Sequence, residues 1–142
     1  MAEDLRDEVH AMADLNIKHQ DEADETREFA DKGRVEIFDL DGSKMGLVRM
    51  EPGWRWSVHV KPQMGTERCM AHHLGYCAAG RMKIRMESGE EGEIGPGDTF
   101  SISPGHDAWV EGDEAFVAVD FGAPEAFARK APPAEAAPPP IH

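Results

Sequence analysis

The sequence predicts an all-β protein, either a β-sandwich or a closed barrel of about eight to ten short strands. Three observations support this class. Short segments that alternate between apolar and polar residues follow one another from Arg34 to Phe121. Turn-forming glycines and prolines separate them at intervals of about 8–12 residues. No internal repeat and no long helical period interrupts the pattern.

The strands are expected in chain order as follows. Residues 35–38 and 45–50 form a pair across the turn Asp41-Gly42-Ser43. Residues 54–61 alternate strictly and are predicted to form a strand, followed by a loop from Pro62 to Glu67 and a long strand from Cys69 to Ala79. The remaining strands are expected at 82–87, 93–94, 100–102, 109–110 and 116–121.

The flanks differ from this central part in composition. We expect an acidic lead-in at 1–33, a barrel at 34–122 and an Ala/Pro-rich tail at 123–142. Leu5, Val9 and Met12 are spaced as on one face of a helix, so a short N-terminal helix is predicted. The tail is expected to be extended or disordered after a short helical patch.

Charge and hydropathy exclude several classes of partner. The net charge is −13, and residues 1–31 contribute −8 of it, from eleven acids and three bases. An acidic chain repels phosphate backbones and anionic lipids, so neither nucleic acid nor a membrane is an expected partner. No apolar run is long enough to span a bilayer, and the first residues lack the pattern of a secretory signal. We therefore expect a cytoplasmic protein.

The two cysteines, Cys69 and Cys77, are expected to be reduced. In one extended strand they would lie about 26 Å apart, which is too far for a disulfide. They could supply a soft metal ligand or fill small core volume, which is the commoner role of a buried cysteine.

Two glycine-marked segments resemble the motifs of the cupin superfamily. In the first, Gly53 is followed after five residues by His59, and His73 is followed after six residues by Gly80. In the second, Gly97-Asp98 is followed after five residues by Pro104-Gly105. The resemblance covers about residues 35–121 and implies a double-stranded β-helix (jelly-roll) barrel, many of whose members hold one divalent metal inside.

The chain departs from these motifs at several ligand positions. Lys61 stands at the place of the second histidine of the first motif, and His73 stands at the place of the glutamate. In the second motif Ala108 occupies the histidine position, and His106 comes two residues early. Because residues two apart in a strand share a face, His106 can still point inward.

The predicted metal ligands are therefore His59, His73 and His106. Three imidazoles suit Fe, Ni, Zn, Mn or Cu and leave positions open for water and substrate. Such a site keeps a charge of +2 and favours an anionic, chelating small molecule, and it resembles the three-histidine sites of the thiol dioxygenase cupins.

Each ligand has a simpler interpretation. His59 shares its predicted face with Arg55, Ser57 and Lys61, which could be the solvated side of a sheet. A shift of register by one residue would turn His72 inward in place of His73. His106 could only hydrogen-bond its own turn.

Three further residues are candidates for roles beside the metal. Arg55 or Lys61 could orient an anionic substrate, with Arg the better match to a carboxylate. Tyr76 could act as an acid or base, although it alternates with His73 and could instead pack.

The leading hypothesis is a metal-dependent cupin enzyme, a dioxygenase, lyase or isomerase acting on a small anionic metabolite. The alternative is a non-catalytic cupin that binds or senses a small ligand, because a fold alone does not specify function. A metal-free sugar-nucleotide epimerase would need a His–Asp pair facing the cavity, and the sequence shows no obvious pair. A homodimer is expected, since tryptophans and methionines occupy strand faces.

Overall fold

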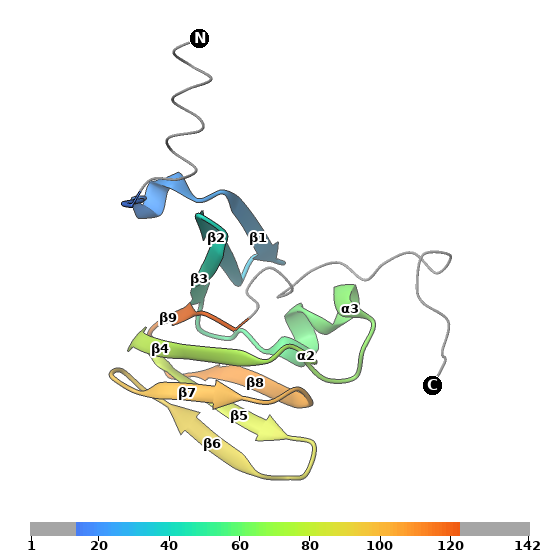
Figure 1. The fold of residues 1–142 in the computed structure, drawn as a ribbon. Helices are drawn as coiled ribbons and strands as arrows, with labels where there is room; N and C mark the ends of the chain where they lie inside the picture. The colour runs from blue at the N-terminus through green and yellow to red at the C-terminus, as the bar shows by residue number, and fades with distance from the viewer. Residues whose placement is uncertain (1–13, 123–142) are drawn as a thin grey trace, which may run out of the picture.

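The computed structural model describes residues 14–122, which form nine strands in two antiparallel sheets (Figure 1). The six-stranded sheet has the order β1-β2-β3-β9-β4-β7, and the three-stranded sheet has the order β6-β5-β8. The strands are β1 (Glu25–Phe29), β2 (Gly33–Leu40), β3 (Ser43–Met50), β4 (His73–Ala79), β5 (Arg81–Met86), β6 (Glu91–Ile94), β7 (Thr99–Ile102), β8 (His106–Glu111) and β9 (Phe116–Asp120).

Segments distant in sequence pair to build the barrel. β9 lies between β3 and β4, so the last strand joins the N-terminal strands to the strand that begins at His73. β4 also pairs with β7, whereas β8 pairs with β5 in the other sheet (Figure 1). Side chains from both sheets fill the space between them, among them Val48, Met82 and Ala118. The all-β double-stranded prediction is confirmed.

The N-terminal part of the barrel begins earlier than expected. Residues 25–29 form β1, which pairs along its whole length with β2, so this segment is a strand and not part of a helical lead-in. Phe29 at its end is fully buried, and its ring lies 6.2 Å from that of Trp54. A short 3₁₀ turn, η1 (Gln20–Glu22), precedes it. The predicted helix around Leu5, Val9 and Met12 and the tail 123–142 lie outside the described residues.

The prediction of a strand at 54–61 is wrong. The chain there forms two single-turn helices, α2 (Trp56–His59) and α3 (Lys61–Met64). Trp56 and Val60 are both buried and lie four residues apart, a spacing that also fits one face of a helix. Gly65 ends α3 in the left-handed conformation, with φ 77°, where glycine is favoured.

The predicted strand at 69–79 is regular only from His73 onward. Residues 69–72 approach the strand as a loop, and Cys69 forms an isolated β-bridge with His106. Within β4, His73, Gly75 and Cys77 are buried while Leu74 and Tyr76 are exposed, so the alternation expected for this segment is present. No helix within residues 14–122 is long and apolar enough to cross a membrane.

Candidate metal centre

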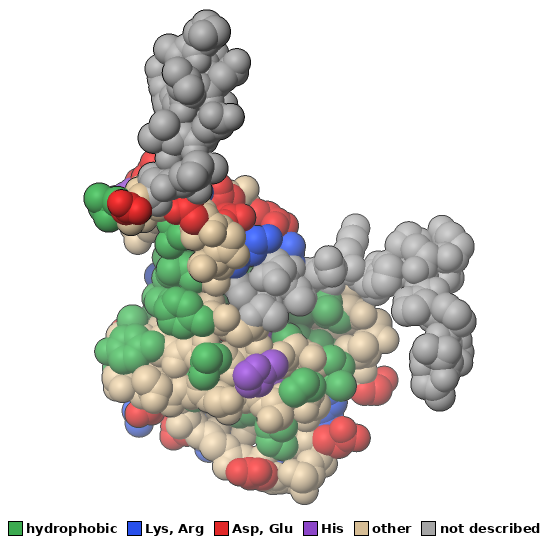
Figure 2. All heavy atoms as spheres, in the orientation of Figure 1, with side chains coloured by type: hydrophobic (Ala, Val, Ile, Leu, Met, Phe, Trp, Pro, Cys, Tyr) green, Lys and Arg blue, Asp and Glu red, His purple; other side chains and the backbone are tan. Residues whose placement is uncertain are grey.

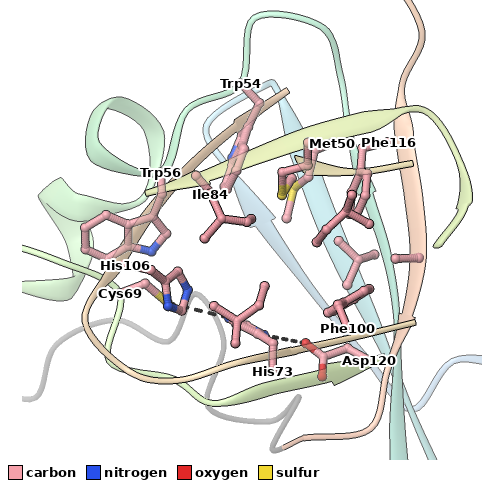
Figure 3. Close-up of a pocket in the computed structure, with 16 residues that line it drawn as sticks. Met50, Trp54, Trp56, Cys69, His73, Ile84, Phe100, His106, Phe116 and Asp120 are labelled. Carbon is pink, nitrogen blue, oxygen red and sulfur yellow. Dashed lines mark hydrogen bonds and ion pairs between the residues drawn. The ribbon is translucent and has the colours of Figure 1, made fainter. Parts of the chain in front are cut away.

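Cys69, His73 and His106 lie together inside the barrel (Figure 3). One potential ligand atom from each falls within 4.8 Å of the others, and all three residues are buried. Backbone hydrogen bonds place them: the amide of Cys69 donates to the carbonyl of His106 at 2.8 Å, and the amide of Gly105 donates to the carbonyl of Cys69 at 2.8 Å. The group therefore joins the loop before β4, the start of β4 and the start of β8.

Hydrogen bonds on the outer side of both imidazoles fix which nitrogen faces the group. Nδ1 of His73 lies 2.5 Å from Oδ2 of Asp120, and Nδ1 of His106 lies 2.7 Å from the carbonyl oxygen of Ser103. A carboxylate and a carbonyl only accept, so each Nδ1 carries the hydrogen. In the neutral imidazoles each Nε2 is left with a lone pair, and Nε2 of His73 lies 3.6 Å from Sγ of Cys69. This is the arrangement of metal-ligating histidines, whose other nitrogen is held by an acceptor.

The electrostatics of the group favour a thiolate. Burial disfavours the charged form of Cys69, but interactions with His106 and His73 outweigh it and lower the pKa of Cys69 from 9.0 to about 6. Burial likewise disfavours the imidazolium of His73, but the hydrogen bonds to Asp120 and Cys69 outweigh this and raise the pKa of His73 from 6.5 to about 9. Without a metal, these pKa shifts favour a Cys69 thiolate beside a His73 imidazolium, whose Nε2 proton a bound metal would replace.

The group opens onto a small, almost entirely apolar cavity. Its volume is about 40 Å³, enough for a metal ion with one or two small ligands but not for a sugar ring. The polar lining consists of Cys69, His73, His106 and Asp120, and no Lys or Arg lines the cavity. Apolar side chains from both sheets and from the 54–56 segment form the rest, including Met50, Trp54, Trp56, Ile84, Phe100 and Phe116 (Figure 3).

The donor set fits a transition metal. In a tetrahedral site with a metal–sulfur distance of about 2.3 Å and a metal–nitrogen distance of about 2.0–2.1 Å, sulfur and nitrogen lie about 3.6 Å apart. The separation of Cys69 Sγ from His73 Nε2 equals this value. One thiolate and two imidazoles leave a fourth position open, as in catalytic zinc sites with three protein ligands.

The structure does not bring His59 to this group. His59 ends α2, and its Nδ1 accepts a hydrogen bond from the backbone amide of Arg55 at 3.0 Å. Because residues 56–59 are helical, the side chain does not follow the inward direction that a strand would have given it. His73 and His106 do lie at the cavity, and Cys69 stands where His59 was expected.

The three residues proposed to act beside the metal also lie away from the cavity. Arg55 lies over the ring of Trp109, with its guanidinium carbon 4.3 Å from the ring centroid, and its Nε lies 3.4 Å from Asp107. Lys61 pairs with Glu67 at 2.9 Å.

Tyr76 is 46% exposed on the outer face of β4. These positions leave no role for Arg55, Lys61 or Tyr76 in direct contact with a ligand in the cavity.

The choice between the two neighbouring histidines is resolved in favour of His73. His72 is exposed, and its Nε2 lies 3.2 Å from the hydroxyl of Ser101. His73 is 7% exposed and faces the cavity. The strand register therefore matches the one in which Ala71, His73 and Gly75 share a face.

Asp120 was missed, although the sequence carried a signal for it. In the segment 116–120 it shares a strand face with Phe116 and Ala118, and an acid on an inward face needs a partner. It is 2% exposed and pairs with His73. A His–Asp pair, which was not obvious in the sequence, therefore does face the cavity, although the cavity is too small for the sugar of an epimerase substrate.

Comparison with known proteins places the fold. No protein-family model and no curated protein matches the chain. Among solved structures, it is similar to ectoine synthase from P. lautus, with TM-score 0.54 and 16% identity over 87% of this chain and 96% of that one.

Two further structures resemble it. An RmlC-like cupin from Shewanella frigidimarina has TM-score 0.53 and 12% identity over 80% of this chain and 96% of that one. A conserved protein with a double-stranded β-helix domain from Klebsiella pneumoniae has TM-score 0.50 and 19% identity, over 78% and 91%. These likenesses show that the chain has a double-stranded β-helix fold, the fold that its glycine-marked motifs implied.

Proposed function

We propose that the protein binds one divalent transition metal through Cys69, His73 and His106 and acts as an enzyme on a small molecule bound beside it. The observation that supports this is the pair of Nδ1 hydrogen bonds that turn both Nε2 lone pairs toward a buried sulfur. A buried group of three potential ligands with one open position is what metal-assisted catalysis requires.

One thiolate and two imidazoles restrict the range of metals that suit the site. A thiolate is a soft ligand that suits zinc and copper, and two imidazoles also suit iron and nickel. Manganese, one of the metals expected from three histidines, fits this set less well because it prefers oxygen ligands. The metal would act here as a Lewis acid that polarises a substrate oxygen or lowers the pKa of a bound water.

The chain's own residues have separable roles in this proposal. Asp120 orients His73 and increases the basicity of its Nε2, and the carbonyl of Ser103 does the same for His106. The apolar walls exclude water, which strengthens electrostatic interactions inside the cavity. The indole N–H of Trp54, in the same wall, has no hydrogen-bond partner among the described residues, so a ligand with an acceptor atom could satisfy it.

The structure weakens two hypotheses from the sequence, that the protein is a dioxygenase and that its substrate is an anion. Both rested on three neutral imidazoles, one of them His59, around a centre of charge +2. With Cys69 as thiolate the charge of the centre falls to +1, and no Lys or Arg lines the cavity to bind an anion.

Metal analysis tests the proposal. Protein purified without a His tag is expected to hold about one metal per chain, and cobalt added to metal-free protein should give the charge-transfer absorption of a thiolate ligand. Cys69→Ser should abolish that absorption, whereas the matched control His59→Ala should leave metal content and spectrum unchanged. A metal content near zero that added zinc or cobalt does not raise, or loss of binding in His59→Ala alone, would contradict it.

A non-catalytic binding or sensing protein is the second candidate. The small volume of the cavity favours it, because 40 Å³ leaves little room for a substrate to rearrange. Stabilisation by a ligand in a thermal-shift screen, without turnover of any compound tested, would support this alternative over the enzyme.

A homodimer is proposed through the outer face of the six-stranded sheet. Leu74, Tyr76 and Phe121 are each about half exposed there. Figure 2 shows hydrophobic side chains and a histidine on this side of the molecule, with acidic residues gathered toward its borders. Two chains of charge −13 can approach most easily through an uncharged face. Sedimentation equilibrium should show a dimer that Tyr76→Glu dissociates; a wild-type monomer would contradict it.

A further inference from the structure

The metal-binding group is shielded from solvent, so any ligand that reaches it needs a route. Cys69, His73, His106 and Asp120 are 2–7% exposed. The cavity beside them is bounded by side chains from both sheets. An entrance must therefore lie where the wall between the cavity and the surface is thin and able to move.

A large surface groove lies on the other side of one such wall. It has a volume of about 670 Å³, in the range of small-molecule sites, and runs between β6 and β7. These strands are the free edges of the two sheets, since β7 ends the six-stranded sheet and β6 ends the three-stranded sheet. No strand within residues 14–122 pairs with either of these two edges.

Four apolar side chains separate the groove from the cavity, because the same four line both: Ile84, Ile94, Phe100 and Ile102. The partition is thus one side chain thick. Phe100 is the largest of the four and is only partly buried.

The ring of Phe100 lies against β4 opposite Gly75, where an added Cβ would come within 2.8 Å of its Cζ. The missing side chain of Gly75 makes room for the ring in its closed position.

The charges of the groove select what enters it. Its lining contains Glu90, Glu91, Glu93 and Asp98 but no Lys, Arg or His. Arg85 and Arg81, outside the lining, pair with Glu91 and Glu93 at 3.0 and 3.4 Å. The groove keeps a net negative charge even so, which attracts cations and repels anions.

We propose that the groove between β6 and β7 is the entrance to the metal cavity, that Phe100 closes it, and that it admits a positively charged small molecule in preference to an anion. This names the substrate class of the proposed function and rests on it for what the molecule meets inside. The route itself depends only on the partition and the groove.

The test uses Cys69 as a reporter of access, in metal-free protein with Cys77→Ala so that Cys69 is the sole thiol. Two methanethiosulfonate reagents of similar size, one carrying an ammonium and one a sulfonate, transfer their thioalkyl group to the thiolate and release methanesulfinate. Phe100→Ala should raise the modification rate at least tenfold, and Phe100→Trp should lower it. Tyr76→Ala removes an aromatic ring from the outer face of the neighbouring strand and should leave the rate within twofold.

Charge selection is read from the ratio of the two rates. Glu90→Gln should lower the preference for the ammonium reagent about two- to fivefold at low salt, and added salt should remove the effect. Glu28→Gln, on β1 and outside the groove, is the matched control for net charge and should leave the ratio unchanged.

Equal rates in Phe100→Ala and Tyr76→Ala, with both variants folded, would overturn the entrance. If Phe100→Ala does not fold, an unchanged rate in Phe100→Trp overturns it instead. Equal ratios in Glu90→Gln and Glu28→Gln would overturn the charge selection. Because the assay needs no metal, its result does not depend on whether the protein binds one. A protein that takes up no added zinc or cobalt but still shows a Phe100-dependent rate would refute the proposed function and leave the entrance supported.

Discussion

The hydrogen bond between Asp120 and His73 allows a quantitative test of the metal centre. Oδ2 of Asp120 accepts from Nδ1 of His73 at 2.5 Å, and Oδ1 accepts from the amide of Gly122 at 2.8 Å. Both carboxylate oxygens of Asp120 therefore accept hydrogen bonds. Asp120→Asn keeps the shape of the side chain but has only one acceptor oxygen. Its NH₂ group must therefore point at the N–H of either His73 or Gly122, where two donors would meet. It also removes the negative charge that holds the imidazole.

The expected loss of metal affinity follows from the buried position of this pair. Replacing a residue that orients a metal-ligating histidine lowers metal affinity about 10- to 100-fold, or about 1.4–2.8 kcal/mol. With Asp120 only 2% exposed, water cannot replace the lost acceptor, and we expect the upper half of that range. Competition between the protein and a chelator of known zinc affinity measures the change.

Asp113→Asn provides the control, since it removes one negative charge at an exposed hairpin position. It should leave the zinc affinity within twofold. If Asp120→Asn also left it within twofold while the protein stayed folded, Asp120 would not position His73, and the argument from the Nδ1 hydrogen bonds would fail.

Two further predictions concern the metal-free protein and the barrel wall. Since the folded pKa of Cys69, about 6, lies below its ordinary value of 9.0, its contribution to stability is present at high pH and is lost as the pH falls through 6. The pKa of His73 is raised from 6.5 to about 9, so its contribution is present at low pH and is lost as the pH rises through 9. Between pH 6.5 and 9 the two contributions change in opposite directions by about the same amount, so the free energy of unfolding from this pair should be nearly independent of pH there. Cys69→Ala leaves only the contribution of His73, and the free energy measured by urea denaturation should then fall as the pH rises over this range. Gly75→Ala should cost about 2–4 kcal/mol in the same assay, because its Cβ would lie 2.0 Å from the carbonyl oxygen of Val119, whereas Gly92→Ala, with nothing within 4 Å, should change stability by less than about 0.5 kcal/mol.

The strand pattern could be predicted from the sequence because glycines mark the turns between the strands. Gly80 has a positive φ of 77° and stands so close to the backbone of Ala115 and Phe116 that a side chain would not fit. Only glycine fits at position 80, so this residue marks in the sequence where the preceding strand, β4, ends. Small residues alternate with large ones along 69–79, and this alternation agrees with the inward direction of His73 that the structure shows.

The error at 54–61 has a physical cause. In a segment of eight residues, Trp56 and Val60 fit both a strand period and a helical one, and only tertiary packing decides between them. The mistaken strand is what put His59 among the predicted ligands, whereas the helix α2 keeps it out of the cavity lining. Cys69 could have been predicted as a ligand, because in a strand it would share a face with His73 at a spacing of four residues. It was not chosen because a cysteine in an apolar strand most often fills core volume.

The charges of the candidate ligand set are compatible with a metal ion buried in an apolar cavity. A divalent ion held by three neutral imidazoles would leave a charge of +2 in an apolar cavity, which is strongly unfavourable without compensation. Here the thiolate of Cys69 supplies one negative charge, and the carboxylate of Asp120, behind His73, supplies another. A divalent metal, the thiolate and the carboxylate would together be neutral within the barrel. A buried cysteine in place of the half-buried His59, with an acid paired to the second ligand, would therefore allow a metal to lie in a cavity whose other walls are hydrocarbon.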